Sequence, residues 1–300
     1  MYLHYFRFLM LVLLGVIVPV VSPQAASVLV DAAWLESQLK DPNLVVIDMT
    51  DEDLQYTRYH IPGAVRLAYS DLLNAPVGKK PPTPLSDNQL AMQLGQLGIA
   101  RETRLVLYDD MGGLNAGRLF LDLERIGHPA VSVLDGGLVK WVLEGRRVEN
   151  IPVLRKPATY TLGKTRRANV ATFSDVQRAA SKADPVTLLD VRSRDEYTGS
   201  PKESRSGHIP QARWWPWEQA IRMDSGFTFH KPEVLLTSLA RAEVQDQKTP
   251  IILYCRSGHR ASQSYLTLRH LGFENVRVYS GSMNEYQMDR SAQLVRGLTP

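Results

Sequence analysis

Two kinds of segment alternate along the chain after residue 26. Short apolar runs carry almost no polar side chains, which is typical of strands that are buried on both faces. They lie at residues 44–49, 105–108, 185–191 and 251–254. Longer segments with the helical spacing of apolar residues separate them. These lie at residues 87–97, 117–126 and 262–271. The alternation predicts the α/β class, with mainly parallel sheets covered by helices on both faces.

The same plan occurs twice. The features that recur in order are an apolar run containing Asp48 or Asp190, a His-Ile-Pro segment, a second apolar run and a glycine-containing run near residue 136 or 281. Such a repeat indicates an internal duplication, and a length of 300 residues also fits two domains. We expect a first domain at residues 27–150, a linker at 151–168 and a second domain at 169–300.

The first 26 residues resemble a secretory signal. An uncharged apolar run at residues 8–21 follows a short head with one Arg, and small residues come after it. Because the run is shorter than the ~20 residues of a membrane span, we expect cleavage and no stable membrane insertion afterwards. The mature chain is then exported, in a bacterium to the periplasm. An uncleaved membrane anchor is the alternative.

Charge and cysteine content limit the kinds of partner and of chemistry that the sequence supports. The net charge is +4, but Lys and Arg are scattered, so we expect a small anionic partner and no nucleic acid. Cys255 is the single cysteine and can form no internal disulfide. A lone cysteine is commonly a buried structural residue, and that is the alternative to a reactive thiol.

Cys255 stands at the predicted end of a strand and just before a predicted helix. Backbone N–H groups converge at such a junction, and the positive end of the helix dipole faces it. Arg256 and Arg260 add positive charge, and His259 adds more when protonated. A thiolate is stabilised there, which favours a nucleophile over a structural cysteine. The first half has Asp109 at the matching position, so we expect thiolate chemistry only in the second half, with the first half closing the site.

These features together resemble the rhodanese sulfurtransferases: Asp190-Val191-Arg192 at a strand end, the Gly-His-Ile-Pro segment and the cysteine loop. The duplicated form with one cysteine is similar to the two-domain thiosulfate and 3-mercaptopyruvate sulfurtransferases. The resemblance implies two tandem rhodanese-like domains and a persulfide on Cys255. It further implies that Arg256, Ser257, Gly258, His259 and Arg260 bind the substrate. Asp190 and Arg192 close a strand on the same edge as the cysteine loop, so we expect them to support the loop by hydrogen bonds.

Two positions bear on the donor. Arg256 is typical of thiosulfate enzymes, whereas Ser257 is typical of mercaptopyruvate enzymes. Glu196 stands where many two-domain members carry a substrate-binding Arg, so we expect that contact to come from elsewhere, such as Arg260. Thiosulfate is the favoured donor and 3-mercaptopyruvate the alternative.

The expected mechanism is attack of the Cys255 thiolate on the outer sulfur of the donor, followed by transfer to an acceptor. With no second cysteine, the acceptor is external: cyanide, a small thiol or a protein thiol. We expect no cofactor and no metal. One rival is a sulfur carrier that does not turn over small donors. The other is a phosphatase, which needs a Cys-x5-Arg loop, whereas here Arg260 comes one position early.

Overall fold

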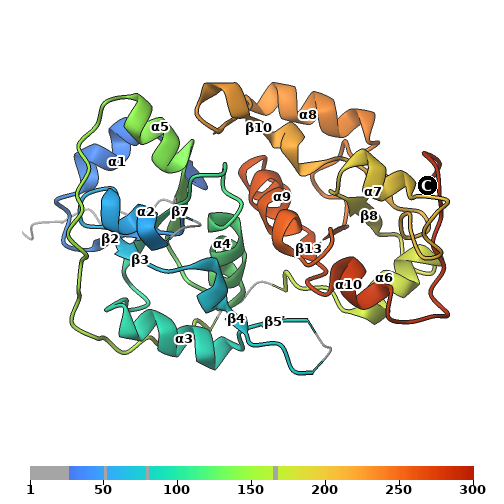
Figure 1. Cartoon of the computed structure of the whole chain (residues 1–300), viewed down its shortest axis with the longest axis horizontal. Coiled ribbons are helices and arrows are strands. Elements are labelled where there is room, and N and C mark those ends of the chain that lie inside the picture. Colours follow the sequence, from blue (N-terminus) through green and yellow to red (C-terminus); the bar gives the residue numbers. More distant parts are fainter. Residues whose placement is uncertain (1–26, 51–52, 79–80, 165–167) are drawn as a thin grey trace, which may run out of the picture.

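The computed structural model describes residues 27–50, 53–78, 81–164 and 168–300. The predicted signal segment lies outside them. In this part of the chain, no helix is both long enough and apolar enough to span a membrane. Figure 1 shows two domains side by side, the first coloured blue to green and the second yellow to red.

The first domain contains a five-stranded, all-parallel sheet in the order β1-β7-β6-β2-β3. Its strands are β1 (Leu29–Val30), β2 (Leu44–Asp48), β3 (Val65–Arg66), β6 (Arg104–Tyr108) and β7 (Val131–Leu134). An antiparallel pair is formed by β4 (Leu73–Asn74) and β5 (Thr83–Pro84). The helices are α1 (Ala32–Gln38), α2 (Asp53–Arg58), the 3-10 helix η1 (Tyr69–Leu72), α3 (Asp87–Gln96), α4 (Ala116–Arg125) and α5 (Gly137–Leu143).

The second domain contains a four-stranded parallel sheet in the order β13-β12-β8-β9. Its strands are β8 (Thr187–Asp190), β9 (Arg213–Trp214), β12 (Ile251–Tyr254) and β13 (Val276–Val278), and β10 (Ile221–Arg222) pairs separately with β11 (Thr228–Phe229). The helices are α6 (Phe173–Ala180), α7 (Arg194–Thr198), η2 (Trp217–Ala220), η3 (Met223–Ser225), α8 (Pro232–Arg241), α9 (His259–His270) and α10 (Ser282–Tyr286).

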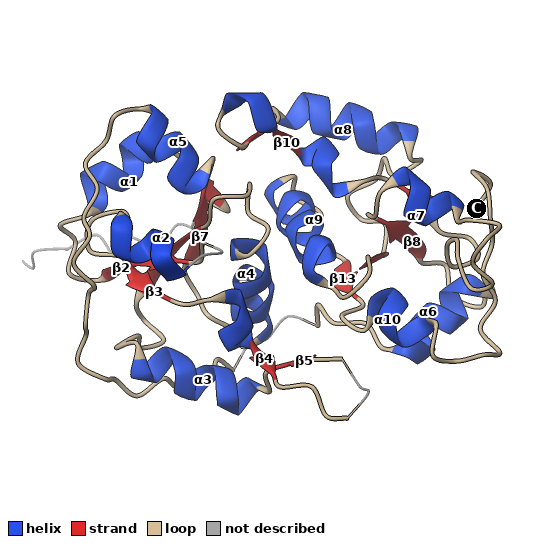
Figure 2. Ribbon diagram, viewed as in Figure 1, coloured by secondary structure: helices blue, strands red, loops and turns tan. Residues whose placement is uncertain are grey.

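The central strands explain the uninterrupted apolar runs. In β12, Ile251 and Leu253 pack into one core cluster, while Ile252 and Tyr254 pack into another on the opposite face. All four are fully buried, because helices lie on both sides of the strands, as Figure 2 shows. The predicted fold class, two tandem α/β domains with parallel sheets, is confirmed.

One detail differs from the sequence expectation. Helix α9 begins at His259, three residues before the predicted start, because Gly258 adopts a left-handed conformation (φ 87°) that turns the chain directly into the helix. Val170 forms only a single bridge to Val278, at the sheet edge where the first domain has β1. Residues 151–164 form neither helix nor strand. The exact domain boundaries stay predictions.

The domains meet where α4 packs against α9, in the centre of Figure 1. Gly117 in α4 permits this approach, because a Cβ atom there would lie 2.9 Å from Gln263 Cα and 3.0 Å from the Ser262 carbonyl oxygen. Apolar side chains of both helices belong to one continuous core cluster. The two domains therefore share a packed interface next to the first turn of α9.

Candidate active site

Cys255 lies in the turn between β12 and α9, with a side chain that is 1% exposed. Its sulfur accepts a hydrogen bond from the Gly258 N–H at 3.1 Å. A side chain at position 258 would bring a Cβ within 2.8 Å of the Ser280 carbonyl oxygen, so only glycine fits this turn. The loop thus turns back on the sulfur atom and holds it with the Gly258 N–H.

The neighbouring helices fix the loop from two sides. The first N–H groups of α9 have no partner within the helix, and they begin directly after the loop, where an anion is stabilised. Ser282 at the start of α10 accepts the Cys255 N–H through its hydroxyl at 3.1 Å. The N–H groups of Met283 and Asn284 donate to the carbonyl oxygens of Cys255 and Arg256. Sequence reasoning missed these contacts of α10.

Arg260 forms a bidentate ion pair with Glu196, at 2.7 and 2.9 Å. Burial raises the pKa of Glu196, but the hydrogen bonds and charge of Arg260 outweigh it and lower the pKa to about 2. Glu196 also accepts the N–H of Ser193 and completes a capping box at the start of α7. The charge of Arg260 is therefore largely compensated, which the sequence expectation of a substrate contact did not foresee.

Arg256 and Ser257 are exposed. In the described part of the chain, the Arg256 guanidinium has no ion-pair partner, unlike that of Arg260. Arg256 borders a cavity of about 370 Å³ beside the loop. The other lining residues are Arg192, Asp195, Glu196, Gly199, Ser200, Glu203, Arg205, Ser206, Gly207, Met283 and Gln287. Arg256 is thus the cation of the loop that is available to an anion from solvent.

His259 points toward the first domain. Its Nε2 lies 2.7 Å from Asn115 Oδ1, and its ring stacks on Tyr69 with centroids 3.9 Å apart. Burial raises the pKa of Tyr69, and the nearby Cys255 also acts to raise it. Sequence reasoning missed Tyr69 and Asn115. The usable signal was the position of Asn115, in the first-domain loop that corresponds to the cysteine loop.

Asp190 and Arg192 lie where the sequence predicted, at the end of β8. Arg192 donates to both carboxylate oxygens of Asp190 and to the carbonyl oxygen of Gly207 at 2.9 Å. These bonds join the strand end to the Gly-His-Ile-Pro segment. They support the loop through the scaffold and not by a hydrogen bond to it.

Asp109 occupies the corresponding position of the first domain and is 1% exposed. Its carboxylate accepts the backbone N–H groups of Met111, Gly113, Asn115 and Ala116, at 2.8–3.0 Å. Burial raises the pKa of Asp109, while these N–H groups act to lower it. The first-domain loop is thus closed around its own carboxylate.

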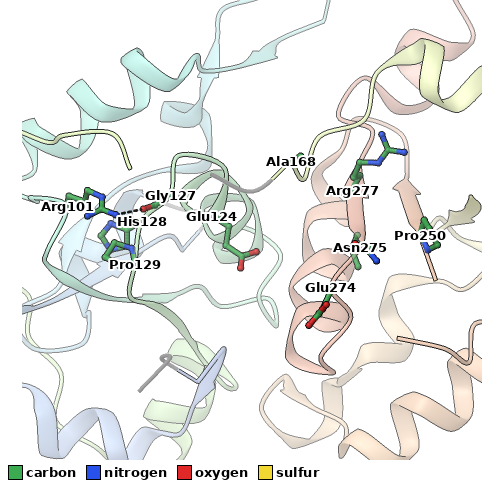
Figure 3. A pocket seen from close by; sticks show the side chains of 11 residues that line it. Arg101, Glu124, Gly127, His128, Pro129, Ala168, Pro250, Glu274, Asn275 and Arg277 are labelled. Atoms are coloured by element: carbon green, nitrogen blue, oxygen red, sulfur yellow. Dashed lines mark hydrogen bonds between the residues drawn. The ribbon is translucent and has the colours of Figure 1, made fainter. Parts of the chain in front are cut away.

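A larger cleft, of about 850 Å³, lies between the domains at the other end of the sheets. Figure 3 shows its walls, with His128 and Arg101 from the first domain and Asn275 and Arg277 from the second. Pro250 lines it and precedes β12, whereas Cys255 follows β12, so this cleft is separate from the sulfur. The described residues contain no group of three or more His, Cys, Asp or Glu that could hold a metal ion.

The profile of the rhodanese-like domain matches residues 31–144 and 172–289. The chain belongs to the rhodanese family. A Mycobacterium bovis protein named "Putative thiosulfate sulfurtransferase 1" is 35% identical over 269 residues, covering 86% of this chain and 94% of that protein. The Thermus thermophilus "Sulfur carrier protein TtuD" is 32% identical over 271 residues, covering 86% and 93%.

Solved structures share this fold. SseA from Escherichia coli, a 3-mercaptopyruvate sulfurtransferase, superposes with a TM-score of 0.73 at 25% identity, covering 86% of this chain and 99% of that one. An anaerobic ergothioneine biosynthesis enzyme from Chlorobium limicola shares the fold, with a TM-score of 0.78 at 20% identity, covering 90% and 70%. The protein is a rhodanese-type sulfurtransferase with two tandem domains, as the sequence predicted.

Proposed function

We propose that this rhodanese transfers the outer sulfur of thiosulfate, through a persulfide on Cys255, to cyanide or a thiol acceptor. The observation that carries the proposal is the Cys255 sulfur held by the Gly258 N–H at the start of α9, with the exposed cation of Arg256 next to it in the chain. Backbone donors and a cation at this place stabilise both a thiolate and the anionic persulfide that follows.

The proposed reaction has two displacements. The Cys255 thiolate attacks the outer sulfur of thiosulfate, the S–S bond of the donor breaks, and its electron pair leaves with sulfite. Cys255 then carries the persulfide anion. Cyanide attacks the outer sulfur of the persulfide, takes it as thiocyanate and returns the thiolate. No proton, oxidant or reductant is required in either step.

Thiosulfate is preferred over 3-mercaptopyruvate for two reasons. Sulfite leaves thiosulfate without a proton, whereas breaking the C–S bond of 3-mercaptopyruvate yields an enolate that must be protonated. The loop supplies cations for an anionic donor, whereas its imidazole, that of His259, is held against Asn115 and Tyr69 instead of facing a substrate enolate. The exposed Arg256 supports recognition of an anionic sulfonate-like donor.

Mass spectrometry tests the persulfide. Protein incubated with excess thiosulfate and no acceptor is expected to gain the mass of one sulfur atom, which cyanide then removes. Cys255→Ser is expected to show neither the gain nor turnover, since a hydroxyl in this position stays protonated and holds no sulfane sulfur. Sulfur loading of the Ser variant, or turnover in wild type without a loaded intermediate, would overturn the proposal.

The same experiment separates the rival functions. Loading by 3-mercaptopyruvate and not by thiosulfate would identify the alternative donor. Stoichiometric loading without steady-state thiocyanate formation would identify a sulfur carrier, the function in the name of the Thermus thermophilus relative. Release of phosphate from an aryl phosphate would revive the phosphatase, which the position of Arg260 disfavours.

We further propose that the protein is exported, on the basis of the apolar segment at residues 8–21. The expected observation is a periplasmic form whose N-terminus lies close to residue 27. Recovery of the full-length chain in the membrane fraction would instead show an uncleaved anchor.

A further inference from the structure

The active-site loop makes a polar contact with the domain that has no cysteine. His259, the first residue of α9, lies between two side chains of the first domain. Its Nε2 is 2.7 Å from Asn115 Oδ1, and its ring stacks on Tyr69 at an interplanar angle of 23°. His259 is next to Gly258, whose N–H holds the sulfur of Cys255. A shift of His259 would therefore move the Gly258 N–H that binds the sulfur.

The orientation of Asn115 is fixed independently of His259. Its amide nitrogen donates to the Met49 carbonyl oxygen at 2.9 Å, so the amide oxygen is the atom that faces the imidazole. An amide oxygen only accepts, and the Nε2 of His259 must therefore carry a hydrogen and donate it. Asn115 is 1% exposed, which leaves it no second orientation exposed to water.

Asp109 explains how the first domain presents Asn115. Its carboxylate accepts the backbone N–H of Asn115 at 2.8 Å and that of Ala116 at 2.9 Å, at the start of α4. The N–H groups of Met111 and Gly113 bind the same carboxylate. The residue that stands in place of the cysteine is thus the anchor of the loop that contacts His259.

We propose that Asn115 and Tyr69 are positioning residues for sulfur transfer, which hold His259 and thereby keep the Cys255 loop in its sulfur-binding geometry. The inactive domain then contributes a fixed contact to the active loop through its own anchored loop. The proposal rests on the proposed function of Cys255. It differs from a general docking role, because α4 and α9 also contact each other far from the sulfur, where Glu124 pairs with Arg269 at 3.2 Å.

The test uses the single cysteine. The alkylation rate of Cys255 by iodoacetamide is measured against pH, and its midpoint reports ionisation of the thiol whatever its accessibility. Donor kinetics with thiosulfate are measured in parallel. The charged and titratable groups around the sulfur loop are Arg256 and His259 in the loop itself, Arg260 with its partner Glu196, and Tyr69 of the first domain.

Asn115→Ala and His259→Leu are each expected to raise the alkylation midpoint and to lower kcat/KM for thiosulfate about 3- to 10-fold, the range of one lost hydrogen bond. The double variant is expected to lose less than the sum of the two single losses, since both single variants remove the same His259–Asn115 contact. His259→Gln is expected to retain kcat/KM within about 2-fold, because the Gln amide nitrogen can donate to Asn115 as Nε2 does.

Tyr265→Phe is the matched control. It removes a hydroxyl that contacts Glu124 across the same interface, at a distance from the cysteine loop, and is expected to leave both readouts unchanged. Equal losses in Tyr265→Phe and Asn115→Ala, additive losses in the double variant, or a Gln variant as impaired as Leu would overturn the positioning role. A wild-type protein that thiosulfate does not load would instead refute the proposed function, while the alkylation midpoints would still decide the role of Asn115.

Discussion

Replacing Glu196 by Gln isolates the ion pair that compensates Arg260. Gln is accepted at the third position of a capping box, so the start of α7 at Ser193 keeps its cap while the negative charge is lost. The Arg260 guanidinium then keeps one neutral acceptor in place of a carboxylate. Glu196→Gln thus changes charge with little change in shape, and any effect reports the ion pair.

The loss of stability expected for Glu196→Gln follows from the pKa of Glu196, which is about 2 in the folded protein, whereas its ordinary value is 4.5. At about 1.36 kcal/mol per pH unit, the difference sets an upper bound of about 3 kcal/mol. The two side chains are 29% and 22% exposed, and solvent screening reduces the expected loss of stability to about 1–2 kcal/mol at pH 7.

The pH dependence has a definite sign. Because the folded pKa is depressed, the contribution of Glu196 is complete above pH 4.5 and is lost as pH falls toward about 2. Urea unfolding of wild type and Glu196→Gln is expected to show the full difference at pH 7 and less than half of it at about pH 3. Asp195→Asn, on the same helix, is the control for a general charge effect and is expected to cost below about 0.5 kcal/mol.

Released from its partner, Arg260 is expected to raise kcat/KM for thiosulfate about 2- to 10-fold, because a compensated cation near the sulfur becomes available to an anionic donor. The interpretation would be wrong if Glu196→Gln destabilised the protein no more than Asp195→Asn, or if its stability deficit stayed constant down to pH 3. Unchanged donor kinetics together with lost stability would mean that Arg260 acts only in the scaffold.

Three further predictions follow from single contacts. Arg256→Ala is expected to lower kcat/KM for thiosulfate, with a loss of transition-state stabilisation of about 1.5–3 kcal/mol. Tm is expected to stay unchanged, since the exposed guanidinium holds no other described side chain. Equal kinetics in the variant would show that Arg256 does not bind the donor. Asp109→Cys is expected to load no sulfur at position 109, and a second sulfur in the mass spectrum would contradict this. The variant is also expected to lower the unfolding free energy by at least about 2 kcal/mol, because four backbone N–H groups lose a charged acceptor. Burial lowers the pKa of His128 from 6.5 to about 4, so the unfolded chain binds the proton first and stability falls as pH drops between these values. His128→Gln is expected to lack up to about 3 kcal/mol of that fall in urea titrations, and an identical slope would refute the assignment.

The fold was largely readable from the sequence because its central strands are buried on both faces. Ile251, Ile252 and Leu253 are all apolar for that reason, and the repeat supplied an independent check. The junction of β12 and α9 placed Cys255 correctly, since a strand end followed by glycine and a helical pattern has few other geometries. The start of α9 was misplaced because the left-handed Gly258 and polar His259 carry no helical signal of their own.

The contacts between elements far apart in sequence were not readable. The pairing of Arg260 with Glu196 joins residues 64 positions apart, and that of His259 with Asn115 joins residues 144 apart. Local sequence patterns predict the helix or strand that each residue belongs to. Which residue of another element a charged side chain contacts depends on how the elements pack, and local patterns do not contain that information. Arg260 was therefore expected to face the donor, whereas in the structure it forms an ion pair with Glu196 of α7.

Gly117 makes the active site sensitive to a substitution at a residue that takes no part in the chemistry. A methyl group there would meet the backbone of Gln263 at 2.9 Å, one turn beyond the residue that begins α9. Helix α9 would have to retreat from α4, and its first turn would move with the reactive sulfur. A library restricted to polar and reactive residues would overlook this position. Yet this glycine of the first domain sets the distance between α4 and α9, on which the position of the Cys255 loop depends.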